Sequence, residues 1–285
     1  MIGPIRSILF VPGSRQDRFA KAMHAGADAV AFDLEDGVEA AHKERARALI
    51  AEFLSAPAVS QALRLVRFNP VQTAAGEGDI ECFQSVTWFD GILLPKVETP
   101  GVLEQVARAF GTRVPVPPLL PLLESPRAIL RAAEIAAADA PIAALLFGAE
   151  DLTAQLAVAR TIDGEELLFP RASIALAAAA SGAEAIDGVC TNLDDLAALR
   201  RDGERARALG FRGKLAIHPR QVPVINEIFT PSGPDIDRAR RVIEAYEAAR
   251  AAGEGVTRMG SQMVELPVVE RARRTLALAA RFGGP

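Results

Sequence analysis

Two carboxylate residues, Glu124 and Asp151, each follow a run of nearly uninterrupted apolar residues, in the segments PLLES and FGAEDL. If both runs are neighbouring strands about 4.8 Å apart, the two carboxylates can share one ion. Oxygen ligands without a nearby His or Cys favour a hard cation, so the pair predicts a Mg²⁺ site, with Mn²⁺ as the alternative metal. An ion pair with Arg67 or Lys96 is the structural alternative, and it does not exclude the metal.

Three further carboxylates stand together in the segment DLED, at Asp33, Glu35 and Asp36. By strand alternation Asp33 and Glu35 share a face, and Asp36 falls on the loop that follows. Such carboxylates suit hydrogen bonds to the waters of a metal site. For Asp36, capping of the next helix is the alternative.

Two groups of cations accompany these carboxylates. Arg67 lies in the otherwise apolar segment LVRFNP, and its planar fork can bind a carboxylate of the substrate or that of Glu35. The turn 13–15 opens a predicted helix that carries Arg18 and Lys21, and a helix N-terminus with nearby cations can bind phosphate. The sequence therefore offers sites for both a small carboxylic acid and a phosphate-bearing group.

Short apolar segments that alternate with longer amphipathic ones must position these residues. The predicted strands are Ser7–Pro12, Ala29–Asp36, Leu63–Pro70, Gly91–Glu98, Val116–Glu124, Ile142–Asp151, Ala183–Asn192 and Lys214–Pro219. The predicted helices lie near residues 16–26, 39–55, 77–86, 101–110, 126–138, 165–181, 194–209 and 220–229.

Eight strand–helix units predict an α/β fold, a (β/α)₈ TIM barrel, over residues 1–232. An open doubly wound sheet is the alternative, but no GxGxxG follows the first strand. Residues 233–285 add no strand to the repeat and predict a helical C-terminal extension, which packs on its own barrel or on a neighbouring subunit. In a barrel, the active site lies at the carboxyl ends of the strands, where the charged residues collect.

The composition excludes some classes of partner. A net charge of −4 over 285 residues gives no reason to expect nucleic acid or an anionic membrane surface. The chain starts without a secretory signal, and no apolar run is long enough for a membrane helix. Cys82 and Cys190 lie outside any CxxC motif, so we expect free thiols in a reducing cytoplasm.

In this order, the motifs resemble those of the citrate lyase β-subunit-like, or malyl-CoA lyase-like, branch of the HpcH/HpaI aldolase family. The matching segments are LFVPGSRQDRFAKA, AVAFDLEDGV, VRFNP, ILLPKVE, PLLES, FGAEDLTA, AIHPRQV and GSQMVELPVVERA. They extend from residue 9 to about residue 273, and DLEDGV, GAEDL and IHPxQ together are highly specific.

The resemblance implies a Mg²⁺-dependent barrel, typically a homotrimer or hexamer, that acts on CoA thioesters. The expected substrates are malyl-, citramalyl- and citryl-CoA, with a small 2-oxo acid and an acyl-CoA as products. It implies metal ligands at Glu124 and Asp151, a catalytic arginine that binds the carboxylate of the 2-oxo acid at Arg67, and catalytic carboxylates at Glu35 and Asp36. Residues expected to contact substrate or CoA also include Phe10, Arg15, Lys21, Glu150, Ile217 and His218.

One position departs from the family pattern. Where relatives read MVD or MID, with an Asp that enters the neighbouring subunit's active site, this chain has Met263-Val264-Glu265. The extra methylene of Glu265 would displace the carboxylate by about 1.5 Å, enough to weaken a positioned acid–base step. We therefore expect poor thioester hydrolysis and a purer lyase, unless Glu265 only caps the last helix.

Two other functions stay open at this stage. One is a class II aldolase that adds the enolate of pyruvate to free aldehydes, although such an enzyme needs no phosphate site at Arg15 and Lys21. The other is a citryl lyase subunit that works only on a carrier-protein thioester. His218, in AIHP, contacts a ligand or caps a loop.

Overall fold

The computed structural model describes residues 2–58, 60–111, 113, 115–253 and 255–283. The chain divides into two compact units, Met1–Asn226 and Glu227–Pro285, and the boundary falls within helix α10 (Val222–Phe229). Each unit is described by itself below.

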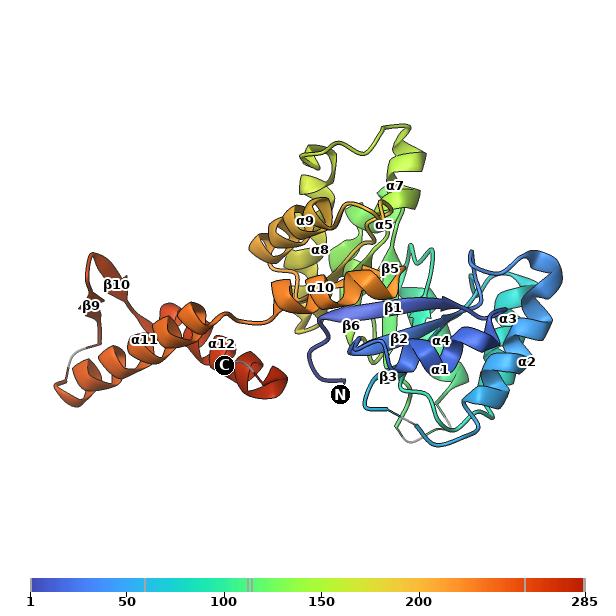
Figure 1. The fold of residues 1–285 in the computed structure, drawn as a ribbon, viewed down its shortest axis with the longest axis horizontal. Coiled ribbons are helices and arrows are strands. Elements are labelled where there is room, and N and C mark those ends of the chain that lie inside the picture. Colours follow the sequence, from blue (N-terminus) through green and yellow to red (C-terminus); the bar gives the residue numbers. More distant parts are fainter. Residues whose placement is uncertain (1, 59, 112, 114, 254, 284–285) are drawn as a thin grey trace. The chain divides into compact units, whose positions relative to one another are not determined.

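The first unit is a closed parallel barrel (Figure 1). Its strands, in spatial as in sequence order, are β1 (Ser7–Pro12), β2 (Ala29–Asp33), β3 (Leu63–Arg67), β4 (Gly91–Leu94), β5 (Leu119–Leu123), β6 (Ala144–Phe147), β7 (Glu184–Asp187) and β8 (Gly213–Ala216). Nearly every strand residue is buried, because a parallel barrel is covered by helices outside and filled by side chains inside. The predicted (β/α)₈ barrel is therefore confirmed.

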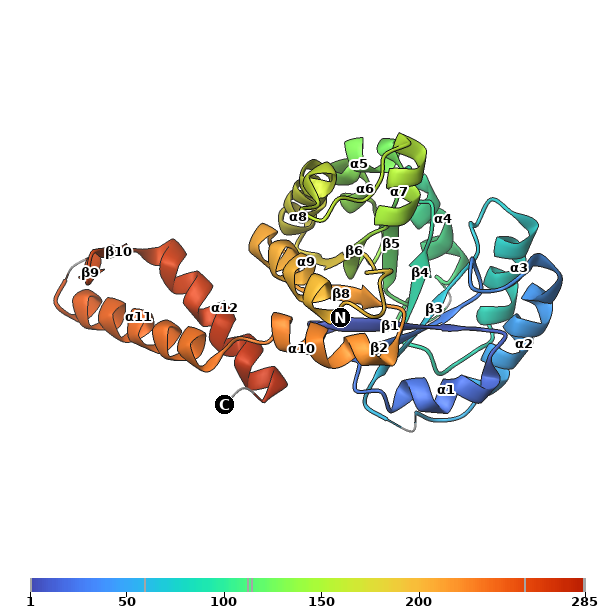
Figure 2. The same cartoon turned by 45° about the horizontal axis from the view of Figure 1, so that its top comes forward.

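Helices surround these strands (Figure 2). They are α1 (Gln16–Met23), α2 (Lys43–Phe53), α3 (Ala74–Phe83), α4 (Pro100–Ala109), α5 (Pro126–Leu130), α6 (Ala132–Ala136), α7 (Ala149–Leu156), α8 (Leu168–Ser181), α9 (Leu196–Leu209) and α10, with short 3₁₀ turns η1 (Ala40–His42), η2 (Glu165–Leu167) and η3 (Pro219–Gln221). None of the described helices is long and apolar enough to cross a membrane.

Aliphatic side chains fill the inside of the barrel. Ile8, Leu65, Leu93, Leu146 and Ile186 belong to one buried cluster to which every strand contributes. This filled interior makes the strands a rigid frame, so a residue at the end of a strand is held in a defined place.

The register brings charged residues of neighbouring strands together at the carboxyl end. Pro12 of β1 pairs with Asp33 of β2, and Asp33 pairs with Arg67 of β3. On the other side of the barrel Leu123, which precedes Glu124, pairs with Phe147 of β6. These predicted site residues thus lie at or just after strand ends on the same rim of the barrel.

The predicted strands begin within three residues of the observed ones, and all except the first extend too far at their carboxyl ends. The clearest error is strand 6, which ends at Phe147, so that Glu150 and Asp151 lie in the first turn of α7. Acidic residues are stabilised at a helix N-terminus, which explains the early helix start. The apolar run alone did not distinguish the end of a strand from the start of a helix.

The second unit is a helical hairpin with a small antiparallel ribbon. Helix α11 (Gly233–Ala251) starts with a capping box in which Ser232 and Asp235 bond each other's backbone. The ribbon pairs β9 (Thr257–Met259) with β10 (Gln262–Val264), and α12 (Leu266–Phe282) follows. A small apolar cluster that includes Val242, Val264 and Val269 holds the hairpin together. The ribbon was not predicted.

A buried network of charges ties α8 and α9 to the barrel. Asp187, fully buried at the end of β7, accepts hydrogen bonds from Nε and Nη2 of Arg171, both at 2.9 Å, and from Lys214 of β8. Asp202 of α9 lies 2.6 Å from Arg171 and 2.7 Å from Lys214. Because both cations are buried, loss of one carboxylate would leave uncompensated charge inside the protein.

We therefore expect Asp187→Asn to destabilise the barrel by about 3 kcal/mol or more. Thermal unfolding followed by circular dichroism should show a midpoint lowered by about 6–12 °C for a unit of this size. Asp163→Asn is the matched control, because Asp163 pairs with Arg205 at the surface with 73% of its side chain exposed. An equal effect of the two substitutions would contradict the role assigned to the network.

Candidate active site

Glu124 follows β5 and is buried at the carboxyl end of the barrel, with 3% of its surface exposed. Its Oε1 accepts a hydrogen bond of 2.7 Å from the backbone N–H of Lys96, which follows β4. On the other side Gly148 lies so close that a Cβ there would be 2.3 Å from the Cβ of Glu124. The carboxylate of Glu124 is thus fixed between two neighbouring loops.

Lys96 brings a positive charge among the carboxylates. Its Nζ lies 3.4 Å from Oδ1 of Asp151 and 3.5 Å from Oε1 of Glu35. Its backbone has a φ of 53°, in the left-handed region that a residue with a side chain rarely adopts. This strained conformation accompanies the bond from the Lys96 N–H to Glu124, and strain of this kind is concentrated at functional sites.

Arg67, at the end of β3, is bound by carboxylates of the protein itself. Its Nε and Nη2 donate to the two oxygens of Asp33 at 2.6 and 2.7 Å, and its Nη1 lies 2.8 Å from Oε2 of Glu35. The guanidinium also lies over the ring of Phe10, 4.9 Å from the ring centre. Of the two predicted partners for Arg67, the structure contains Glu35, and it adds Asp33.

The DLED segment folds as a tight turn around Asp33. The oxygens of Asp33 accept hydrogen bonds from the N–H groups of Glu35, at 2.8 Å, and of Gly37, at 2.9 Å. Asp36 is 63% exposed and lies 3.8 Å from Nη1 of Arg67. The next helical turn begins only at Ala40, so the alternative of a helix cap by Asp36 is wrong.

Burial and like charge raise the pKa values of the two innermost carboxyls. For Glu124, burial followed by the charges of Glu35 and Asp151 raises the pKa to about 8. For Glu35, burial is the main cause of a pKa of about 7, which Arg67 and Lys96 keep from rising further. Burial opposes the charged form of Lys96, but the surrounding carboxylates outweigh it and raise its pKa. The site is therefore short of positive charge.

This donor set fits a divalent cation. Both oxygens of Glu35 are buried, and neither accepts a hydrogen bond of good geometry from the described residues. Those residues form no cluster of three or more His, Cys, Asp or Glu that would hold a metal unaided. Two carboxylates with free coordination positions for water and substrate are the arrangement that Mg²⁺ favours.

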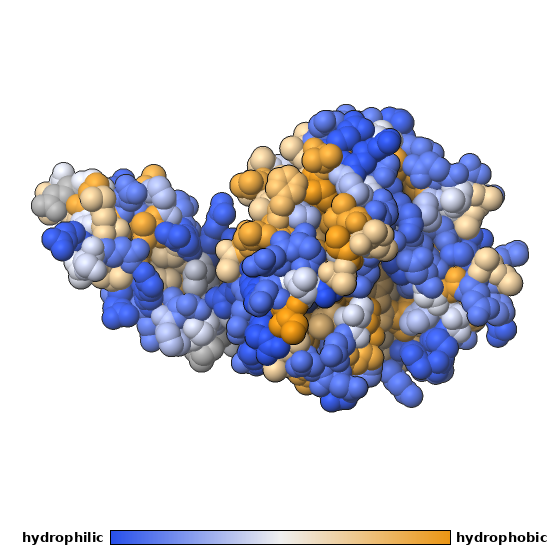
Figure 3. Space-filling model, turned by 90° about the horizontal axis from the view of Figure 1, so that it is seen from above, coloured by the Kyte–Doolittle hydropathy of each residue, from blue (hydrophilic) through white to orange (hydrophobic). Residues whose placement is uncertain are grey.

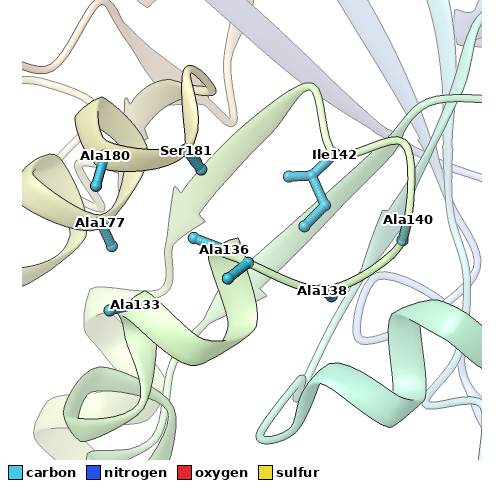
Figure 4. Close-up of a pocket in the computed structure, with 9 residues that line it drawn as sticks. Ala133, Ala136, Ala138, Ala140, Ile142, Ala177, Ala180 and Ser181 are labelled. Carbon is cyan, nitrogen blue, oxygen red and sulfur yellow. The ribbon is translucent and has the colours of Figure 1, made fainter.

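A cavity of about 560 Å³ opens beside these groups. Glu35, Asp36 and Lys96 line it together with Lys43 and Asn69. A second cavity, of about 340 Å³, lies near α6 and α8 (Figure 4). Its lining consists of alanines, Ile142 and Ser181, none of which can carry acid–base chemistry. The first cavity therefore adjoins the candidate site on the side of Glu35, Asp36 and Lys96.

The remaining predicted residues lie in several places. Arg15 precedes α1 and pairs with Asp17 at the surface, and Lys21 is in the last turn of that helix, about 9 Å further along its axis. Glu150, next to Asp151, pairs with Arg160.

Ile217 and His218 follow β8. Ile217 is 41% exposed, and Nδ1 of His218 accepts a hydrogen bond of 3.1 Å from the N–H of Arg220. His218 therefore has the capping role that was one of its two predicted alternatives. Glu265 occupies the N-cap position of α12, as the capping alternative expected, but it is exposed and its side chain makes no capping hydrogen bond.

Sequence reasoning missed a supporting network below the DLED turn. Nζ of Lys43 donates to the backbone carbonyls of Leu34 and Glu35, at 2.9 and 3.0 Å, and to Asn69. Asn69 in turn bonds Asp79, which also accepts from Arg47. Lys43 and Arg47 are four residues apart on one predicted helix, and that spacing was the available signal.

A closed parallel barrel with converging acidic residues at the carboxyl ends of its strands defines the class of (β/α)₈-barrel enzymes. Residues 6–219 match the HpcH/HpaI aldolase/citrate lyase family. The chain belongs to this family, and it is a carbon–carbon lyase.

Relatives of known name span almost the whole chain. The citrate lyase subunit beta of Leuconostoc mesenteroides subsp. cremoris is 37% identical over 281 residues, covering 96% of this chain and 93% of the relative. A (3S)-malyl-CoA thioesterase of Cereibacter sphaeroides is 37% identical over 276 residues, covering 97% and 95%.

Two solved structures from Mycobacterium tuberculosis are also similar. The protein CitE in complex with magnesium, acetoacetate and coenzyme A has a TM-score of 0.82 and 34% identity, with 98% of this chain and 99% of that chain covered. A citrate lyase beta subunit complexed with oxaloacetate and magnesium has a TM-score of 0.70 and 35% identity, covering 80% and 98%.

The contact between Gly148 and Glu124 yields a test of the site. A methyl group in Gly148→Ala would overlap the Glu124 side chain and push the carboxylate away, so we expect lyase turnover to fall by about 10²-fold or more. Gly101→Ala is the control, because a Cβ at Gly101 meets only one atom, at 4.0 Å. Steady-state rates of both variants measure the effect, and normal turnover by Gly148→Ala would refute the assignment of Glu124.

Proposed function

We propose that this chain is a Mg²⁺-dependent lyase that cleaves a β-hydroxyacyl-CoA, such as malyl-, citramalyl- or citryl-CoA, into a 2-oxo acid and an acyl-CoA. The observation that carries the proposal is the convergence of Glu35, Glu124 and Asp151 around Lys96, next to Arg67. The ligands named for the two similar structures, which are magnesium, acetoacetate, oxaloacetate and coenzyme A, support the same substrate class.

Glu124 and Asp151 are the proposed metal ligands. Glu124 is buried and fixed, whereas the side chain of Asp151 is 39% exposed and can adjust to an ion. When bound, Mg²⁺ would supply a Lewis acid that lowers the pKa of the substrate's hydroxyl. Glu35 and Asp36 are proposed to orient water at the metal site. Glu35 lies 3.5 Å from Nζ of Lys96, Asp36 lies 3.8 Å from Nη1 of Arg67, and the oxygens of Glu35 accept no hydrogen bond from the described residues.

Arg67 is proposed to orient the carboxylate of the 2-oxo acid portion. Asp33 takes the hydrogen of Nε and one hydrogen of Nη2, and Glu35 faces Nη1. A guanidinium has five N–H groups and Asp33 accepts from two of them, so three are left on the side of Arg67 where Glu35 and a substrate can share them. Because Asp33 and Phe10 hold the group in place, little conformational entropy would be lost when substrate binds.

The proposed cleavage needs only one proton to leave and one to arrive. The hydroxyl gives up its proton, its oxygen becomes the new carbonyl, and the electrons of the broken C–C bond pass to the α-carbon of the acyl-CoA as an enolate. A proton then completes the acyl-CoA. The reverse direction, a synthase reaction, follows the same path.

The CoA portion is proposed to extend toward β1 and β8. Phe10 and Arg15 lie at the end of β1 and in the turn after it, and Ile217 and His218 follow β8, its neighbour in the barrel. Arg15 stands at the N-terminus of α1, where phosphate binding is favourable. Lys21 is further along the same helix, and Glu150 is proposed to line the pocket from α7.

We expect Glu124→Ala and Asp151→Ala each to abolish Mg²⁺-dependent cleavage, because each removes one of two protein ligands. Turnover of malyl-, citramalyl- and citryl-CoA with identification of the 2-oxo acid released measures the effect and identifies the substrate. Glu204→Gln on the exposed surface of α9 serves as the control. If either Ala variant keeps most of its activity, the metal assignment is wrong.

Calorimetry with coenzyme A, together with turnover assays, distinguishes the proposed CoA lyase from the two alternative functions. A pyruvate-enolate aldolase would bind no CoA and would turn over pyruvate with a free aldehyde. A citryl lyase subunit would be inactive on CoA thioesters and active on a carrier-protein thioester. The similarity to a citrate lyase subunit beta is the reason to test this alternative. The cationic turn at Arg15 favours the CoA enzyme.

We further propose a homotrimer or hexamer in which Glu265 reaches a neighbour's active site. Glu265 is exposed in the second unit, and the barrel unit carries exposed apolar side chains at Leu168, Phe169 and Leu176 of α8. Apolar surface of this kind, visible in orange in Figure 3, is typical of subunit contacts. The cysteines are free thiols, which fits the cytoplasm as the proposed compartment.

Shortening the side chain in Glu265→Asp should raise thioester hydrolysis relative to C–C cleavage by about tenfold, because about 1.5 Å decides whether a carboxylate can direct water. The ratio of free hydroxy acid to 2-oxo acid among the products gives the measurement. Glu270→Asp, one turn later in α12, is the control. An unchanged ratio would exclude Glu265 from the reaction.

A further inference from the structure

The ammonium group of Lys96 is held more loosely than the other cation of the site. Its distances to the oxygens of Asp151 and Glu35 are 3.4 and 3.5 Å, whereas those from Arg67 to Asp33 and Glu35 are 2.6–2.8 Å. The Lys96 side chain is 44% exposed, against 13% for Arg67. Lys96 can therefore leave its partners at little cost, and Arg67 cannot.

The side chain and the backbone of Lys96 have separate contacts and separate roles. The backbone N–H fixes Glu124, and that bond depends on the left-handed conformation rather than on the ammonium group. The ammonium lies between Asp151, a proposed metal ligand, and Glu35. A movement of the side chain would thus free Asp151 without disturbing Glu124.

The four carboxylates that face the ammonium come from three strand ends. Glu35 and Asp36 follow β2, Glu124 follows β5 and Asp151 lies after β6, and all four favour the charged form of Lys96. Lys43 does not replace it, since its ammonium group is directed to the carbonyls of Leu34 and Glu35 and to Asn69. The ammonium group of Lys96 therefore lies among the same carboxylates that would surround a bound divalent cation.

We propose that Lys96 is a built-in cation that neutralises Glu35 and Asp151 in the metal-free protein and is displaced from Asp151 when the metal binds. The inference rests on the proposed function, because it takes Glu124 and Asp151 as the metal ligands. Its consequence is that Lys96 competes with the metal and lowers its affinity, so that the site releases the ion more readily than the number of carboxylates would suggest.

Binding of Mn²⁺ without substrate, measured from the paramagnetic resonance signal of the free ion, tests this directly. Lys96→Gly removes the charge, and glycine adopts a φ near 53° without strain, so the N–H bond to Glu124 is retained. We expect this variant to bind Mn²⁺ more tightly, on the order of tenfold, since a positive charge 3.4 Å from an oxygen of Asp151, a proposed ligand, is removed. Added salt should reduce the difference, because Lys96 is partly exposed.

Three more variants make the outcome specific. Lys96→Asn, which also tolerates the left-handed region, should match Lys96→Gly, and Lys96→Arg, which keeps the charge, should stay near the unaltered protein. Arg108→Met removes a positive charge from an exposed place on α4 and should change nothing. Equal or weaker Mn²⁺ binding by both Lys96→Gly and Lys96→Asn would overturn the proposal.

Failure of the proposed function would look different. In that case the unaltered protein and Glu124→Ala would bind Mn²⁺ equally, or neither would bind it, and the Lys96 variants would not differ from them. Tight binding that is lost in Glu124→Ala but indifferent to Lys96 would contradict the role of Lys96 alone.

Discussion

Two carboxylates buried side by side, Glu35 and Glu124, can both stay ionised only if positive charge is placed among them. The protein places two cations there, and their attachments differ. Arg67 is tied to Asp33 by two short hydrogen bonds and belongs to the frame of the barrel. Lys96 touches its partners at longer distances and is partly in water. The other contacts of the site hold these charged groups in fixed positions relative to one another.

The frame begins with strand pairing. Asp33 and Arg67 are register partners on β2 and β3, so their bidentate contact needs no long loop to form. Asp33 also accepts from the N–H groups of Glu35 and Gly37, which turns the chain sharply and directs Glu35 back toward Arg67. Lys43 secures the same turn from below through two backbone carbonyls. Carboxylates on a loop thus gain the rigidity of strands.

Much of this could be predicted from the sequence, because a barrel leaves a strong pattern. Buried parallel strands show as apolar runs, and each run ends near polar or charged residues. The barrel and the grouping of Glu35, Arg67 and Glu124 at one end of it could therefore be predicted from the positions of these runs. The carboxyl ends of the strands could not be predicted in the same way. In FGAEDL the apolar run continues into a helix, so the position of Asp151 in α7 was missed. The left-handed backbone of Lys96 leaves no trace in composition, and the network from Lys43 to Asp79 depends on distances between separate helices.

Glu124 and Asp151 look equivalent in the sequence, but the fold treats them differently. Glu124 is clamped by the N–H of Lys96 and by the close backbone of Gly148, so both a strained residue and a glycine serve to fix one carboxylate. Asp151 stands in the first turn of α7, where the helix N-terminus stabilises its negative charge, and much of its side chain is exposed. If both hold the metal as proposed, Glu124 would set the place of the ion and Asp151 could follow it as substrate enters and product leaves. Since Lys96 contacts Asp151 through its side chain and Glu124 only through its backbone, the proposed exchange of Lys96 for the metal would involve Asp151 and leave Glu124 in place.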